Sequence, residues 1–327
     1  MTVQWKPLAL TPAMVRLIGS IDEFKGRWHT LRALPPGQLA EIRSETLLEA
    51  AAATSRLEGR PVKQELLREL MESASSPGRQ DPALSLSLAY GRTLRAVHEL
   101  YAELEPTLHH VAELQRLLFA ETGLENPGLS GEVAAQIERA LEELESDLRE
   151  PSQHPLISIP LFNLRLMSLR PAPLACGRLA RVLTTLLMLR AGYGSAACAA
   201  LETAIENHRG RVHRALRRAQ STGALNDWML TSLQCLADQR AAAERRLDEA
   251  HRREPLPPLS EALIRVAATG EGLSIKRAVE TTGANRNTVK VHVRRLVQTG
   301  RLVQHGRGRA TWYVLPEGNR YGIIPAA

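Results

Sequence analysis

The sequence predicts a mainly α protein, with a large helical body and a small α+β domain at its C-terminal end. Through most of the 327 residues, Ala, Leu, Glu and Arg recur at three-to-four-residue spacing with little clustering of β-branched residues. This spacing is typical of amphipathic helices. Three prolines within residues 255–258 interrupt the pattern, and a helix cannot continue through them. Two short β-type runs follow only after this break.

The prolines mark the predicted domain boundary. We expect an all-helical domain at 1–253, a linker at 254–258 and a second domain at 259–327. Apolar residues make up 44% of the chain, which is enough to give each of two domains a core. The helices expected in the first domain are Thr11–Trp28, Pro36–Ser55, Lys63–Ser73, Ser85–Leu104, His109–Thr122, Gly131–Arg149, Ile157–Leu169, Gly177–Ala191, Ala196–Ala219 and Ala224–Arg253.

The positive charge of the chain is concentrated at its C-terminal end. Of 42 basic and 35 acidic residues, 11 basic and 4 acidic ones lie in residues 255–327, so the remainder contains 31 of each. The net charge of +7 therefore belongs to the second domain. Such a distribution is typical of a polyanion-binding module attached to a neutral body.

Several classes of protein do not fit the sequence. The first residues lack a basic stretch followed by an apolar segment, and arginines interrupt every apolar run before the roughly 18 residues that a membrane span needs. Three cysteines at wide spacing fit neither a disulfide framework nor a zinc site. We therefore expect a cytoplasmic protein with no membrane contact and no metal.

The second domain begins with three expected helices. Residues 261–269 and 274–282 predict two short helices, and a tight Gly-containing turn leads into a third at 286–300. Two helices joined by such a turn form a helix-turn-helix unit. Asn285 is placed to cap the third helix. The apolar face that should pack in the core consists of Val289, Val293, Leu296 and Val297.

The opposite face of the third helix is polar, and a β-hairpin is expected after it. The candidate DNA-binding residues of the helix are Arg286, Asn287, Thr288, Lys290 and Arg294. We expect Arg286, Asn287 and Lys290 to contact base edges in a major groove. The β-type runs Leu302–Gln304 and Thr311–Leu315 flank a glycine-rich tip. Arg307 and Arg309 in that tip would contact phosphates or a minor groove.

Residues 259–315 resemble the winged helix-turn-helix family along their whole length. The resemblance implies double-stranded DNA as the partner. It also favours a homodimer, because one helix-turn-helix contacts few base pairs and two half-sites increase affinity and specificity. The alternative is a domain that mediates protein contacts only, with a basic face that is merely solvated.

A second resemblance lies in the body, in the segment that starts at Leu169. It is similar to the signature of the Fic family, which reads His-Pro-Phe, any residue, Asp or Glu, Gly-Asn-Gly-Arg, two residues and Arg. Four positions match in register: Pro171, Gly177, Arg178 and Arg181. Five positions depart from it: Arg170 replaces the His, Ala172 the Phe, Leu174 the acid, Ala175 the first Gly and Cys176 the Asn.

The sequence around this segment extends the resemblance to roughly residues 7–238. Residues near 44–58 look like the inhibitory helix of the family, which has Ser or Thr, three residues, Glu, then Gly or Asn. Thr54, Glu58 and Gly59 fit that pattern. The resemblance implies that Glu58 pairs with Arg181 as an inhibitory pair. The target-docking hairpin of the family should lie between Gly123 and Gly131, where only a short segment is present.

The departures imply that the body is a pseudoenzyme with no catalytic residue and no cofactor. Fic enzymes usually transfer AMP from ATP, with the His as general base and the acid holding magnesium. A guanidinium cannot accept the proton in place of the histidine, so Arg170 ends that mechanism. Leu174 offers no oxygen ligand for magnesium.

Some of the anion site could persist as a degenerate nucleotide site of Arg170, Gly177, Arg178 and Arg181. In one interpretation Arg181 and Glu58 only hold two helices together, and in the other the pocket binds a nucleotide without turning it over. The leading hypothesis is a transcription regulator in which the body dimerises or senses a ligand. The alternative is an AMP-transferase, or another nucleotide-using enzyme, with an atypical site.

Other histidines and tryptophans receive structural interpretations. His109 and His110 have no partner cysteine or carboxylate at metal spacing. We expect His208 and His213 to be solvated on an arginine-rich helical face. Trp228 is expected to be a packing anchor of the body, and Trp312 to be an aromatic core residue of the hairpin.

Overall fold

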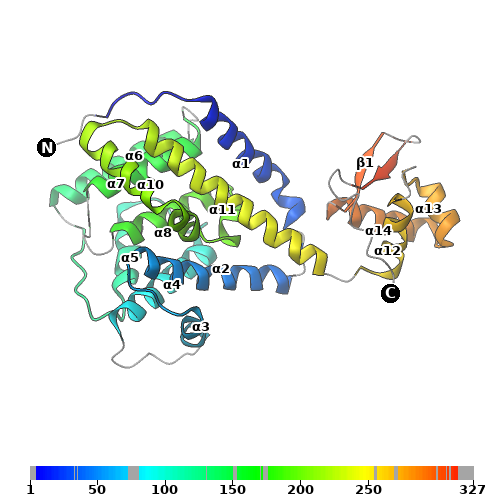
Figure 1. Ribbon diagram of the computed structural model, residues 1–327, viewed down its shortest axis with the longest axis horizontal. Coiled ribbons are helices and arrows are strands. Elements are labelled where there is room, and N and C mark those ends of the chain that lie inside the picture. Colours follow the sequence, from blue (N-terminus) through cyan, green and yellow to red (C-terminus); the bar gives the residue numbers. More distant parts are fainter. Residues whose placement is uncertain are drawn as a thin grey trace. The chain divides into compact units, whose positions relative to one another are not determined.

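The computed structural model describes residues 5–32, 34, 36–72, 81–129, 131–149, 153–169, 171, 176–253, 256–268, 272–299, 301–306, 308 and 311–315. The described chain is mainly helical (Figure 1). It divides into two compact units, one of Met1–Gly26 with Ala40–Glu244 and one of Arg27–Leu39 with Arg245–Ala327. We refer to them as the body and the C-terminal unit.

The body is built from helices joined by short connections. Its elements are α1 (Pro12–Leu31), α2 (Pro36–Leu57), α3 (Gln64–Glu72), α4 (Pro82–Leu100), α5 (Leu108–Phe119), α6 (Gly131–Arg149), α7 (Pro155–Leu169), α8 (Cys176–Arg190), the 3-10 helix η1 (Gly194–Cys198), α9 (Leu201–Asn207), α10 (Arg209–Thr222) and α11 (Asn226–Arg253). Three of these helices, α1, α2 and α11, include some residues that belong to the C-terminal unit.

Helix α8 forms the centre of the body. It packs against α4, α5 and α7 (Figure 1), and Leu179, Val182 and Leu186 on it are fully buried. Each such aliphatic side chain contributes about 1.5–3 kcal/mol to folding. Nearly every residue of α8 is buried, including the polar Arg178, Thr184 and Thr185. This packing holds its first two turns, which carry Arg178 and Arg181, in place.

One expected helix, Ala196–Ala219, is wrong. The structure replaces it with η1, α9 and α10. Gln239 of α11 donates from its Nε2 to the backbone oxygens of Ala196 and Ala199, at 3.2 and 2.9 Å. These bonds give carbonyls near the end of η1 a tertiary partner. Helical spacing of alanines alone could not reveal that interaction.

After α11, the described residues of the C-terminal unit form three helices and a hairpin, in the predicted order. The elements are α12 (Pro258–Ala268), α13 (Ile275–Thr282), α14 (Arg286–Gln298), β1 (Val303–His305) and β2 (Trp312–Val314). The strands are antiparallel, with Gln304 opposite Tyr313. This arrangement is compatible with a winged helix-turn-helix.

The core and caps of this unit follow the sequence pattern. Val289, Val293 and Leu296 are buried, and Val297 packs against them while partly exposed. Gly283 takes a φ of +67° and ends α13, a left-handed conformation that glycine adopts readily. Asn285 caps α14 by accepting a hydrogen bond from the Asn287 backbone nitrogen at 2.8 Å.

Trp312 differs from its expected core position, because it is 43% exposed. Its ring lies over Gly272, where an added Cβ would stand 2.8 Å from the ring. It also stacks on His305, with ring centroids 4.7 Å apart.

Among the described residues, no helix is long and apolar enough to cross a membrane.

Candidate functional sites

Helix α14 presents a polar face to solvent. All five predicted residues of this face are exposed, namely Arg286, Asn287, Thr288, Lys290 and Arg294. In the part of the chain that the structure describes, no carboxylate pairs with Arg286, Lys290 or Arg294. Val291 lies among them and is 66% exposed. The helix therefore combines free positive charge with one apolar contact surface.

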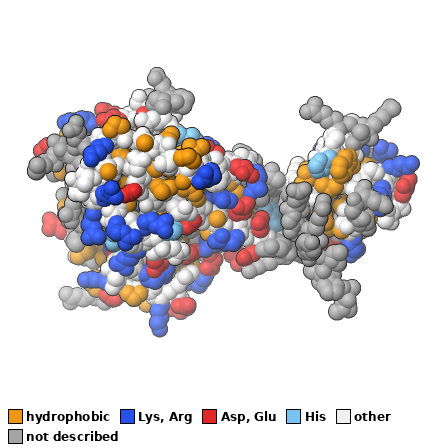
Figure 2. All heavy atoms as spheres, turned by 45° about the horizontal axis from the view of Figure 1, so that its top comes forward, with side chains coloured by type: hydrophobic (Ala, Val, Ile, Leu, Met, Phe, Trp, Pro, Cys, Tyr) orange, Lys and Arg blue, Asp and Glu red, His pale blue; other side chains and the backbone are white. Residues whose placement is uncertain are grey.

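The hairpin adds a second exposed surface to the C-terminal unit. Strand pairing places Val303, His305, Trp312 and Val314 in directly opposed pairs on one face. Val303 is 39% exposed and Trp312 is 43% exposed. Figure 2 shows hydrophobic side chains and a histidine together at the surface of this unit. Arg307 and Arg309, the predicted phosphate contacts of the hairpin tip, lie outside the described residues.

In the body, Glu58 brings together the two arginines of the α8 first turns. Arg178 donates from Nε to Oε1 of Glu58 at 2.7 Å and from Nη2 to Oε2, a bidentate pair. Nη2 of Arg181 lies 3.8 Å from Glu58 Oε1 and 3.4 Å from Thr54 Oγ1. The Arg178 side chain is only 4% exposed, while that of Glu58 is 33% exposed. Glu58 thus contacts Arg178 as well as Arg181, its expected partner, and Arg178 makes the shorter contacts.

Gly177 allows this crowding at the start of α8. A Cβ at this position would lie 3.2 Å from Nη1 of Arg181. Glu58 stands just beyond α2, before Gly59 with a φ of +75°. The chain turns there, and the carboxylate is held at the end of the helix rather than within it.

A buried Tyr90–Glu202 pair lies beside Arg181. The Tyr90 hydroxyl donates to Oε1 of Glu202, and both residues are almost fully buried. Burial raises the pKa of Glu202, and the nearby Arg181 opposes that rise. Burial and the Glu202 carboxylate also raise the pKa of Tyr90. Sequence reasoning missed this pair, because 112 residues separate its members and neither belongs to a motif.

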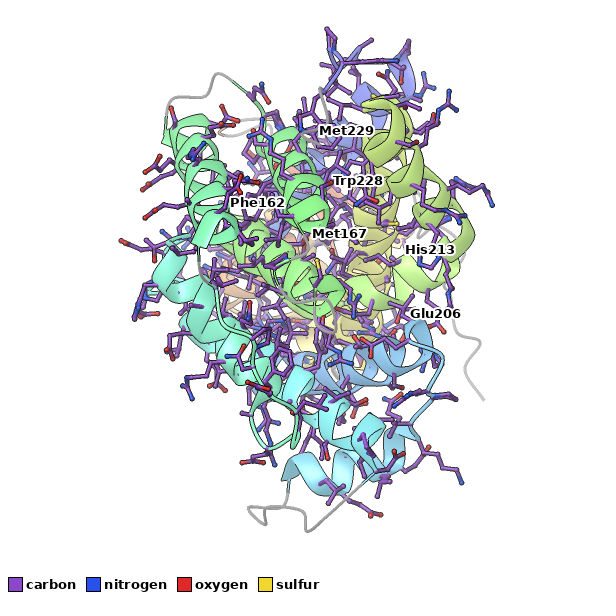
Figure 3. The ribbon with its side chains drawn as sticks, turned by 90° about the vertical axis from the view of Figure 1, so that its left-hand side faces the viewer. Phe162, Met167, Glu206, His213, Trp228 and Met229 are labelled. Atoms are coloured by element: carbon purple, nitrogen blue, oxygen red, sulfur yellow. The ribbon has the colours of Figure 1, made fainter. Side chains whose placement is uncertain are left out.

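A cavity of about 680 Å³ opens beside these arginines. Glu58, Gly177, Arg178 and Arg181 form one part of its wall. Apolar side chains from α7, α9, α10 and α11 form much of the rest: Pro160, Met167, Leu201, Ile205, Val212, Leu216, Trp228 and Leu236. Figure 3 labels Met167, Trp228 and His213, three residues of this wall that come from α7, α11 and α10.

Solved structures identify the fold of the chain. A Fic family protein from Desulfovibrio desulfuricans G20 aligns with a TM-score of 0.60 and 20% identity, covering 96% of this chain and 98% of that one. The chain has the Fic fold. A Fic domain containing signaling protein from Bacteroides thetaiotaomicron VPI-5482 gives a TM-score of 0.54 at 16% identity and covers 73% of this chain and 100% of its own. Fic-1 from C. elegans aligns with a TM-score of 0.55 at 16% identity and covers 74% of this chain and 73% of its own.

At these identities the likeness concerns the fold. No family model matches the sequence, and no curated protein matches it. Arg170, Ala172, Leu174 and Ala175, the departures from the Fic signature that precede α8, lie outside the described residues. Among the described residues, no group of three or more His, Cys, Asp or Glu side chains could hold a metal ion.

The segment where the Fic family has its docking hairpin contains no strand within the described residues 120–129. Asn126 organises this segment by accepting hydrogen bonds from Gln115 Nε2 at 2.9 Å and from the Gly128 backbone nitrogen at 3.1 Å. Leu124 contributes to the wall of the cavity. The short connection therefore packs close to the candidate pocket.

Two other residues of the Fic-fold body have defined partners. The Trp228 indole donates to the Pro160 backbone oxygen at 2.8 Å and is 6% exposed, so its expected role as a packing anchor is confirmed. The expectation that His208 is solvated is wrong. Its Nε2 lies 2.7 Å from the Asp238 carboxylate, and its side chain is 18% exposed. Helix α11 supplies that carboxylate, which the pattern of α10 alone could not indicate.

Proposed function

We propose that this chain is a transcription regulator that binds double-stranded DNA through α14 and the following hairpin. The single observation that carries the proposal is the exposed set of Arg286, Lys290 and Arg294 on one face of a short helix, without a carboxylate partner among the described residues. A reading helix must bury one side and offer donors to base edges on the other. Val291 suits contact with a thymine methyl group.

The Fic-fold body then serves dimerisation or ligand sensing in the cytoplasm and does not transfer AMP. Arg170 and Leu174, at the signature positions of the general base and the metal-binding acid, support this part of the proposal. An arginine does not accept a proton near neutral pH, and a leucine supplies no oxygen to a magnesium ion. We further propose a homodimer, because paired half-sites increase both affinity and specificity.

A second candidate is a nucleotide-using enzyme with an atypical site. The Fic fold itself and the buried Arg178 beside a cavity favour this function. In that case the C-terminal unit would serve only to locate the enzyme. The name of the Bacteroides protein describes it as a signaling protein, which is consistent with either function.

The deciding experiment measures binding of the full chain to DNA upstream of its own gene and to random DNA across a salt series. We expect a strong preference for the upstream DNA and a steep fall in affinity with salt. Each phosphate that the protein neutralises makes the slope of log binding constant against log salt concentration steeper by about 0.9. The Arg286→Ala, Lys290→Ala double variant should lose the preference. Arg217→Ala, which removes an exposed arginine of α10, is the matched control.

Equal and weak binding to both DNAs would contradict sequence-specific regulation. A parallel incubation with labelled ATP tests the enzyme. Labelling of the chain itself in the presence of magnesium would favour AMP transfer. If the same preparation also showed no preference for the upstream DNA, the nucleotide-using enzyme would be the better-supported function.

A further inference from the structure

The cavity of the body has a chemical asymmetry that defines what it can hold. Three arginines border it, Arg60, Arg178 and Arg181, whereas Glu58 is the only carboxylate that the described residues place in its wall. Arg178 is buried and already bonded to Glu58. The wall itself therefore carries more basic than acidic side chains, with the buried Glu202 carboxylate beside Arg181 behind it, and its guanidinium groups can donate to an anion.

Hydrogen-bonding capacity is also left over at this end. Nε of Arg181 is buried and has no hydrogen-bond partner among the described residues, although the Arg181 side chain as a whole is 12% exposed. Oδ1 of Asn163, another residue of the cavity wall, is buried without a partner there as well. Buried polar atoms without partners are costly. Both residues contribute other atoms to the cavity wall.

The other side of the cavity is apolar. Met167, Val212, Leu216 and Trp228 come from three helices and lie in its wall. A volume of about 680 Å³ falls within the usual range for small-molecule sites, which are mostly apolar with a few placed polar groups. An apolar body here would be stabilised by removal of its surface from water.

We propose that this cavity binds an organic acid with one carboxylate and an apolar body of medium length. The Glu58 carboxylate itself displays the geometry in which Arg178 takes a carboxylate group, two parallel hydrogen bonds from one guanidinium. The ligand carboxylate would replace Glu58, which is a third exposed and adjoins Gly59 at the end of its helix. The ligand and Glu58 compete for the same guanidinium.

Decanoate is a suitable probe, with 1-decanol and decyltrimethylammonium as partners of equal chain length and different charge. Calorimetric titration of the full chain should show decanoate binding about tenfold or more tightly than decanol, a ratio worth about 1.4 kcal/mol. Decyltrimethylammonium should bind least. ATP with magnesium, titrated in the same way, should bind more weakly than decanoate.

Three variants separate the parts of the site. Glu58→Gln removes the competing charge and should raise decanoate affinity about tenfold while leaving decanol affinity unchanged. Leu216→Asn places a polar amide in the apolar wall and should weaken both ligands together. Arg217→Gln, on the neighbouring exposed position of α10, should change neither.

Equal affinity for decanoate and decanol in both the wild type and Glu58→Gln would overturn the proposal. Tighter binding of ATP than of decanoate, or no binding of any probe, would overturn it as well. A regulatory role for such a ligand rests on the proposed function, but the titrations contain no DNA. The ligand titrations can therefore fail while the DNA-binding experiment succeeds, and DNA binding can fail while the ligand titrations succeed.

Discussion

The two units of this protein use arginine in opposite ways. In the body, Arg178 is buried and bonded to Glu58, and Arg56 makes hydrogen bonds to Glu206 at 2.8–3.1 Å. In the C-terminal unit, Arg286 and Arg294 stand exposed without a carboxylate partner among the described residues. Residues 1–254 contain 31 basic and 31 acidic residues, whereas residues 255–327 contain 11 basic and 4 acidic ones. Arg178 and Arg56 thus have carboxylate partners within the body, whereas Arg286 and Arg294 of α14 are exposed and lack one among the described residues.

The largest effect expected from this difference is on the stability of the body. Arg178→Ala should lower the free energy of unfolding by about 4 kcal/mol, because it removes a buried guanidinium and leaves Glu58 without its closest partner. Denaturant unfolding followed by tryptophan fluorescence measures this. Arg217→Ala, at an exposed position of α10, should cost under about 0.5 kcal/mol. A similar decrease in the free energy of unfolding in both variants would contradict the prediction that the buried arginine stabilises the body more than the exposed one.

The next effect concerns the exposed set in the C-terminal unit. Arg286→Ala combined with Lys290→Ala should weaken specific DNA binding by about 3 kcal/mol, or roughly 100-fold, without measurable loss of stability. Fluorescence anisotropy with labelled operator DNA measures the change. Arg265→Ala in α12 removes a charge from another exposed position of the same unit and should reduce affinity only slightly. A comparable loss in that control would mean that overall charge alone governs binding.

The same contrast shows how far the sequence can predict this protein. Helical spacing places α6 at its observed bounds and locates α14 with its buried face, because both depend on local patterns. The helix break near Ala199 escapes such patterns, since it depends on a glutamine 40 residues away. Motif register identifies Thr54, Glu58, Arg178 and Arg181 as neighbours. It cannot decide which arginine lies closer to Glu58, because that depends on how two helices pack.

A third prediction concerns His98, in the last turn of α4. Burial, together with the positive charge of Arg43, lowers the pKa of His98 from 6.5 to about 4. Both of its ring nitrogens are buried without a hydrogen-bond partner among the described residues. The unfolded chain takes up the proton more readily than the folded one. The neutral His98 therefore leaves the free energy of unfolding at its full value above pH 6.5. Part of that free energy is lost as the pH falls toward 4, because protonation then favours the unfolded chain.

The expected size of this loss is about 2 kcal/mol, after allowance for the partial exposure of the side chain. His98→Leu should remove that part of the acid sensitivity, so that the variant loses less stability than the wild type between pH 7 and pH 4. Denaturant unfolding at the two pH values gives the comparison. An identical loss in both proteins would assign the acid sensitivity to other groups.

The smallest effect separates the folding of α14 from its proposed use. Asn285→Ala removes the side-chain cap and should cost about 1 kcal/mol of stability in the C-terminal unit. Asn285→Asp keeps the cap, and its negative charge at a helix N-terminus is favourable for folding. The same charge would stand one residue from Arg286 and repel a phosphate backbone.

Asn285→Asp should therefore retain or raise stability while weakening DNA binding several-fold, whereas Asn285→Ala should lower stability and affect DNA binding only by reducing the amount of folded protein. Thermal unfolding and anisotropy on the same samples distinguish the two. If the aspartate left DNA affinity unchanged at low salt, the N-terminal turn of α14 would not approach DNA. The exposed arginines of this helix would then be solvated charge, like Arg217 in the body.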